Sequence, residues 1–179
     1  MSAAAAFAAW LGASLIVLSE GRRGLAAGLT LVTAGFAVIA LVGGGVEAAA
    51  ALVAGGSVAV VQRLRTGPDE WGVMPPGSTA RLVLAAAVGL TALWISTSVM
   101  TGPGAPLRFA AMSVLGLTVA RVLTPSEPPA VLTALGALAL SVAAAAGAAD
   151  TSPGPAPYVL AALVAAGVSW IRVGEFDGA

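Results

Sequence analysis

Long apolar stretches separated by short polar breaks run through this chain of 179 residues. A helix that crosses a bilayer needs about 20 mainly apolar residues, within a range of about 17–25. Glycine and proline lie at most of the breaks and suit the turns between antiparallel helices. The pattern therefore predicts an all-α, polytopic transmembrane helix bundle that forms one domain. Its seven spans are expected at about residues 3–19, 24–42, 46–62, 82–100, 106–123, 130–149 and 158–173.

The fifth stretch has the shortest uncharged part. It runs from Phe109 to Ala120, which is about 18 Å of helix at about 1.5 Å per residue. That length on its own would suit a re-entrant segment. The stretch crosses the bilayer only if the side chains of Arg108 and Arg121 extend to opposite surfaces. We expect a full span because of where the arginines then fall.

The arginines predict the orientation of the bundle. With seven spans and an external N-terminus, only Arg108 falls outside, and the cytoplasmic side receives Arg22, Arg23, Arg63, Arg65, Arg81, Arg121 and Arg172. Such an excess of cytoplasmic arginine is the usual rule. We therefore expect the C-terminus inside and residues 63–81 as a cytoplasmic loop. The first stretch is expected to be an uncleaved anchor, because its positive charges follow the apolar residues, whereas those of a signal peptide precede them.

Composition supports a lipid environment and excludes much chemistry. Charged residues make up 9% of the chain, against about 25% in soluble domains. Histidine, cysteine and lysine are absent, which excludes ordinary zinc sites, His-activated nucleophiles and Schiff-base chemistry. We expect no catalytic residue, no cofactor and no metal, and the balance of eight arginines and eight acids predicts no nucleic-acid binding. Abundant alanine without lysine is typical of a GC-rich bacterial genome, so we expect a bacterial inner membrane.

Two places carry polar groups that bear on an ion or solute site. Ionisable groups inside a bilayer are costly and point to function, and Glu47 lies at the start of the third stretch after three glycines. It either relays protons or binds a cation, or it is a water-facing carboxylate at the positive end of a helix dipole. Ser96, Thr97 and Ser98 form the densest hydroxyl run. They either line a small polar cavity or bond the backbone of their own helix.

The predicted cytoplasmic loop contains a candidate docking site for a partner. Trp71 is preceded by Asp69 and Glu70. This group either contacts a partner protein or belongs to a loop that folds back onto its own bundle. The two acids are adjacent and point to different faces, so we do not expect a lipid-modifying enzyme.

Small residues recur at four-residue spacing, which in lipid permits close helix packing. The second stretch has Gly24 and Gly28, and similar spacings occur in the sixth (Ala139, Ala143, Gly147) and seventh (Ala161, Ala165, Ser169). These faces serve either general packing or a partner. Three spans, a loop and three further spans also suggest an inverted repeat with a seventh helix appended.

In size and composition the chain resembles the accessory hydrophobic subunits of respiratory and antiporter-type complexes, although it lacks their membrane-embedded glutamates. The first functional hypothesis is a non-catalytic integral membrane subunit that scaffolds or seals a larger complex. Its expected partners are the lipid bilayer and either other membrane subunits or a second copy of the chain. The alternative is a small transporter or channel component that uses Glu47 and the hydroxyl run.

Overall fold

The computed structural model describes residues 2–43, 45–66, 70–73, 77–99, 104–124, 127–149 and 154–170. These residues form helices and contain no strand beyond an isolated bridge between Ser19 and Val73. The all-α prediction is therefore confirmed. The elements are α1 (Ser2–Leu18), α2 (Arg22–Val42), α3 (Val46–Arg65), α4 (Thr79–Trp94), the π-helical turn η1 (Ile95–Val99), α5 (Ala105–Leu123), α6 (Pro128–Ala149) and α7 (Ala156–Ser169).

Five helical segments of the described chain are long and apolar enough to cross a membrane: Arg22–Val42, Val46–Arg65, Thr79–Ser98, Ala105–Leu123 and Pro128–Ala146. In length and composition these helices are consistent with a multi-pass membrane protein. The apolar helices Ser2–Leu18 and Ala156–Val168 are shorter. The two shorter apolar segments are therefore the first and the last, and the fifth predicted stretch forms a helix of 19 residues.

The length of α5 follows from how its polar ends are accommodated. Pro106 lies in the first turn, where its missing N–H costs no helical hydrogen bond. Arg121 does not extend to the surface as expected, because its side chain is buried within the bundle and only 1% exposed. An arginine inside the apolar stretch therefore marks a helix–helix contact, and α5 continues past it to Leu123.

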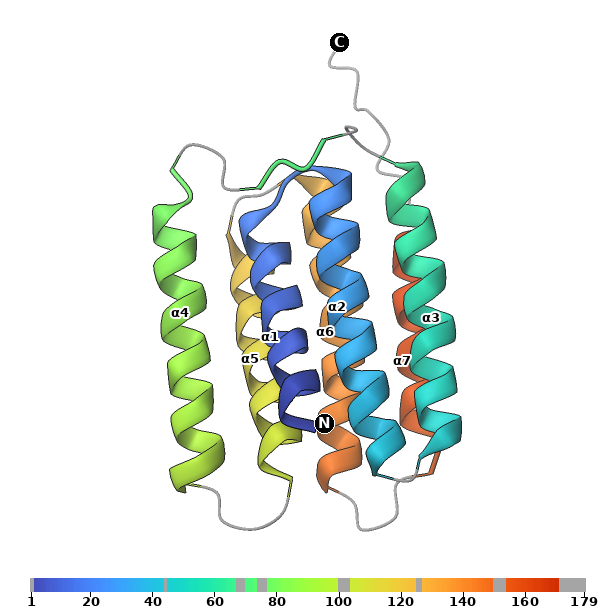
Figure 1. The fold of residues 1–179 in the computed structure, drawn as a ribbon. Helices are drawn as coiled ribbons and strands as arrows, with labels where there is room; N and C mark the ends of the chain where they lie inside the picture. Colours follow the sequence, from blue (N-terminus) through green and yellow to red (C-terminus); the bar gives the residue numbers. More distant parts are fainter. Residues whose placement is uncertain are drawn as a thin grey trace.

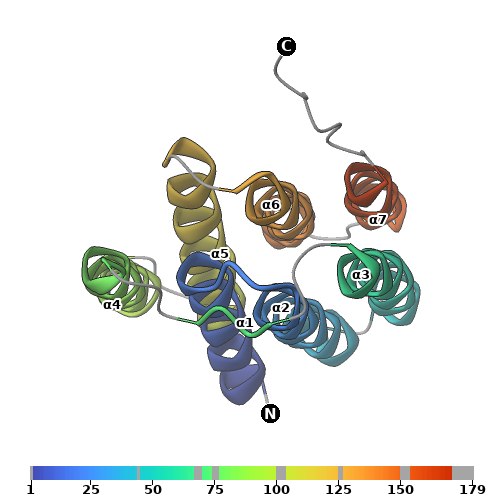
Figure 2. The same cartoon turned by 90° about the horizontal axis from the view of Figure 1, so that it is seen from above.

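The helices form two layers with one helix outside them. α1, α2 and α3 make one layer, and α5, α6 and α7 pack against them in the same order (Figure 2). Consecutive helices run antiparallel (Figure 1), so the second layer also repeats the direction of the first. α4 contacts α1 and α5 and returns the chain to the start of the second layer. The partner of α1 in the second layer is thus α5, which runs parallel to it.

Glycines allow the backbones of α1 and α2 to approach closely. A Cβ atom on Gly12 would lie 2.5 Å from the carbonyl oxygen of Gly28, and one on Gly28 would lie 2.7 Å from that of Gly12. Gly35 meets α1 in the same way at Ala5. In lipid, such backbone contact gives dispersion energy that apolar bulk alone does not supply. The predicted small-residue face of the second stretch therefore packs against α1 at Gly28.

Most arginines gather at one end of the bundle. α2 and α4 begin there and α3 and α5 end there (Figure 1). That end contains Arg22, Arg23, Arg63, Arg65, Arg81 and Arg121, whereas Arg108 lies in the first turn of α5 at the opposite end. The two ends of the described bundle therefore differ in their number of arginines, six against one.

Candidate functional site

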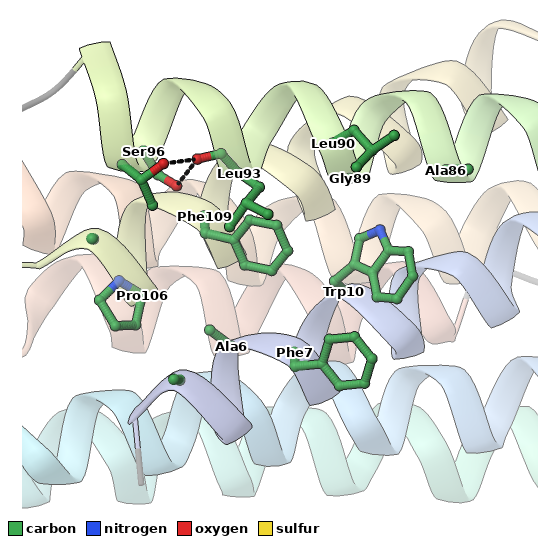
Figure 3. A pocket seen from close by; sticks show the side chains of 13 residues that line it. Ala6, Phe7, Trp10, Ala86, Gly89, Leu90, Leu93, Ser96, Pro106 and Phe109 are labelled. Atoms are coloured by element: carbon green, nitrogen blue, oxygen red, sulfur yellow. Dashed lines mark hydrogen bonds between the residues drawn. The ribbon is translucent and has the colours of Figure 1, made fainter.

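A cavity of about 550 Å³ lies between α1, α4 and α5, next to η1. We call it the side cavity (Figure 3). Its lining is apolar and includes Phe7 and Trp10 from α1, Leu90 and Leu93 from α4, and Phe109 from α5. It exists because α4 lies outside both layers and touches the bundle along a narrow seam.

The Trp10 side chain forms the contact between α1 and α4. Its indole packs directly on Gly89 of α4, where a Cβ atom would collide with the ring. The indole N–H donates to the carbonyl oxygen of Ala85 at 3.4 Å. The ring of Phe7 lies beside it, with the two centroids 5.2 Å apart. A large side chain against a glycine therefore joins the two helices at one level and leaves the space beyond it open.

The side cavity carries polar groups at the end where η1 finishes and α5 begins. Ser96 and Thr97 of η1 line it, and both hydroxyls donate to the carbonyl oxygen of Leu93, at 3.1 and 2.7 Å (Figure 3). Nη2 of Arg108 donates to the carbonyl oxygen of Ser96 at 3.4 Å. π-Helical turns are rare and often occur at functional sites. Ser98 is exposed and is not part of the lining.

Two of the three predicted hydroxyl residues thus face a cavity, and they also bond their own helix. The cavity is apolar over most of its length, so it suits a hydrocarbon chain better than a hydrated ion.

Glu47 does not lie near the side cavity. Glu47 is exposed in the first turn of α3, and α3 and α4 share no contact in the described chain. The structure therefore does not bring Glu47 and the hydroxyl run together.

A charged cluster lies at the arginine-rich end. Nη1 of Arg81 and Oε1 of Glu20 form an ion pair of 2.8 Å, and Nη2 of Arg121 donates to the carbonyl oxygen of Ser19 at 3.2 Å. Within the described chain, Nε and Nη1 of Arg121 and the Ser19 hydroxyl are buried without a hydrogen-bond partner. Sequence reasoning missed this cluster, because its members come from α5, α4 and the α1–α2 turn.

In the predicted docking group around Trp71, the backbone is bonded to the bundle, whereas the described side chains are exposed. The carbonyl oxygens of Glu70 and Gly72 accept hydrogen bonds from the amides of Arg23 (3.3 Å) and Glu20 (3.0 Å), so the loop folds back onto the α1–α2 turn. Its backbone lies close enough to that turn that a Cβ atom on Gly24 would be 2.5 Å from the carbonyl oxygen of Trp71. The Trp71 side chain is 57% exposed, and Glu70 is exposed. Asp69 lies outside the described residues.

A second apolar recess, the outer groove, runs between α6 and α7. It has a volume of about 480 Å³ and extends from Leu135 to Ala146 on α6 and from Pro157 to Val168 on α7. Its floor contains small residues of the predicted four-residue patterns, namely Ala139, Ala143 and Ala161. No charged side chain lines it. A groove between two helices that has a small-residue floor can receive the side-chain ridge of another helix.

The described residues contain no group of three acidic side chains that would hold a metal ion. Searches of family models, of curated proteins and of solved structures find no match to the chain.

Proposed function

We propose that this chain is a non-catalytic subunit of a larger membrane protein complex, in which it binds a transmembrane helix of another subunit. The outer groove is the observation that carries this proposal. It lies between α6 and α7, neither of which contacts α4 in the described chain. Exposed Val142, Leu160 and Val164 line it beside the small residues. Such a surface permits the close backbone approach on which helix association in lipid depends.

The hydroxyl groups inside the bundle support a packing role. The buried residues Ser14, Ser113 and Thr118 each donate to a carbonyl oxygen one turn earlier in their own helix, at 2.7–2.9 Å. These groups are satisfied locally and hold no polar path between helices. Because Glu47 and the hydroxyl run also lie on separate flanks, we favour the scaffolding subunit over a transporter or channel component.

We further propose seven spans, with the N-terminus outside and the C-terminus in the cytoplasm of a bacterial cell. The arginine-rich end would then face the cytoplasm, in agreement with the positive-inside rule. α1 has 17 residues, which is near the lower limit of a span. The expected end of the seventh span, at residue 173, lies outside the described residues.

The orientation is tested with single cysteines, which are unique labels because the chain has none. Thr66→Cys, at the arginine-rich end, should react with a membrane-impermeant maleimide only in inside-out vesicles. Glu47→Cys, at the opposite end, should react only in right-side-out vesicles. Both sites are exposed. Labelling of both from the same side would contradict the proposed topology.

The partner surface is tested with two tryptophan substitutions on α7. Leu160 lines the outer groove and Leu163 does not, although their exposed fractions are similar at 63% and 65%. Leu160→Trp should fill the groove and reduce the partner bound in mild detergent by at least about tenfold, a loss of about 1.4 kcal/mol. Leu163→Trp should leave it unchanged. Native mass spectrometry measures the stoichiometric complex, and a native chain that is monomeric with no bound subunit would contradict the proposal.

A further inference from the structure

We propose that the side cavity binds one acyl chain of an anionic phospholipid, with the phosphate group next to Arg108. This inference is independent of whether the outer groove binds a protein. It requires only that the helices around the cavity lie in a membrane, for which α4 with η1 and α5 are long and apolar enough.

The depth of the cavity matches one leaflet. Its lining on α4 and η1 extends from Ala86 to Thr97, which is about 17 Å at about 1.5 Å per residue. A hydrocarbon core of about 30 Å gives each leaflet about 15 Å. The polar end of the cavity lies at the helix termini, where η1 ends and α5 begins. An acyl chain that enters there would reach the middle of the bilayer beside Ala86.

The walls of the cavity favour a flexible hydrocarbon chain. Helices α1, α4 and α5 enclose it on three sides, whereas the outer groove has walls on two sides only. Its volume of about 550 Å³ lies within the range of about 300–1,000 Å³ that is usual for small-molecule sites. Phe7, Trp10 and Phe109 offer broad apolar surfaces to such a chain (Figure 3).

The charge at the open end selects the headgroup. Arg108 is the one arginine that the described chain places at this end of the bundle. Its hydrogen bond to the carbonyl oxygen of Ser96, a residue that lines the cavity, holds the guanidinium group next to the polar end, beside the first turn of α5. A guanidinium group and a helix N-terminus both attract phosphate. The site therefore prefers a phospholipid with a net negative headgroup over a zwitterionic one.

The experiment uses native mass spectrometry of the full chain after exchange through vesicles of equal parts dioleoylphosphatidylglycerol and dioleoylphosphatidylcholine. The native chain should retain one phospholipid, with phosphatidylglycerol favoured about fivefold, the factor expected from one cationic side chain at a membrane surface. A native chain that retains no phospholipid would overturn the proposal.

Cavity-filling variants test the place of binding. Ala86 lines the cavity and its neighbour Ala87 does not, and both are exposed on α4. Ala86→Phe should lower lipid retention at least about tenfold, and Ala87→Phe should leave it unchanged. Leu90→Trp fills the same cavity from another exposed position and gives a second test if Ala86→Phe does not fold. Unchanged retention in the folded cavity variants, or loss of a bound polypeptide with the lipid retained, would overturn the proposal.

Arg108 variants test the headgroup separately. Arg108→Gln should keep the acyl chain bound but bring the ratio of phosphatidylglycerol to phosphatidylcholine close to one. Arg108→Lys should restore most of the preference, because it restores the charge. A purely structural role of Arg108 would change stability without changing this ratio, and an unchanged fivefold preference in Arg108→Gln would overturn the headgroup assignment.

Discussion

Gly12→Ala is expected to lower the free energy of unfolding by about 1–3 kcal/mol, the usual cost of overpacking a tight interior. The added Cβ atom would lie 2.5 Å from the Gly28 carbonyl oxygen and 2.7 Å from the Val32 amide nitrogen. Both are backbone atoms of α2, so the contact is relieved only by moving the whole helix. Alanine also favours helix over glycine by about 1 kcal/mol. Because that term has the opposite sign, a measured loss would report the helix contact.

Gly136→Ala is the matched control for this prediction. Gly136 also lies within a helix, but its nearest neighbours, atoms of Ala165, would be 3.9 Å from an added Cβ atom. The substitution should leave stability unchanged or raise it by up to about 1 kcal/mol. Unfolding of both variants in mixed detergent–SDS micelles gives the comparison. If the two variants have equal stability, the close contact between α1 and α2 is wrong.

The positions of the helices could be predicted because each apolar stretch is a local feature of the sequence. Every described α-helix overlaps one of the expected stretches, and the glycine and proline breaks fall between helices. The ends were less accurate. α3 continues to Arg65, beyond its predicted end at residue 62, and Arg63 is buried there. An arginine in a bundle can pack among neighbouring helices, whereas the prediction ended this span before its first charge.

The arrangement of the helices could not be predicted, since it depends on contacts between distant residues. The small-residue spacings of the second, sixth and seventh stretches look alike in sequence. In the structure Gly28 contacts α1, whereas Ala143 and Ala161 form part of the outer groove. The role of α4 as a crossover helix, and hence the side cavity, follows from the parallel packing of α1 against α5. No local sequence pattern predicts that α1 packs against α5.

In the candidate sites, too, local features could be predicted from the sequence, whereas contacts between distant residues could not. The hydroxyl run at Ser96 and Thr97 was visible as a dense polar group, but the cavity beside it was not. The pair of Glu20 with Arg81 joins residues 61 positions apart, so no local pattern indicates it. A signal for the buried cluster did exist, because Arg121 interrupts an otherwise apolar stretch.

Arg121 leads to the second large prediction, because it is a large buried side chain with little hydrogen bonding. It has one described hydrogen bond, to the Ser19 carbonyl oxygen, and two of its nitrogen atoms have no partner in the described chain. Replacing a buried charge by an apolar side chain of similar size is often neutral or stabilising by about 1–4 kcal/mol.

Arg121→Ala and Arg121→Met should therefore differ strongly. Alanine removes most of a fully buried side chain, and the cavity should cost about 2–5 kcal/mol of unfolding free energy. Methionine keeps most of the volume and removes the unpartnered N–H groups, while the Ser19 carbonyl oxygen loses one hydrogen bond worth about 1 kcal/mol. We expect Arg121→Met to be within about 1 kcal/mol of the native chain, or more stable, in the same detergent titration. Equal destabilisation by both substitutions would show that the guanidinium group itself holds α5 to the α1–α2 turn, and that its stem contributes little.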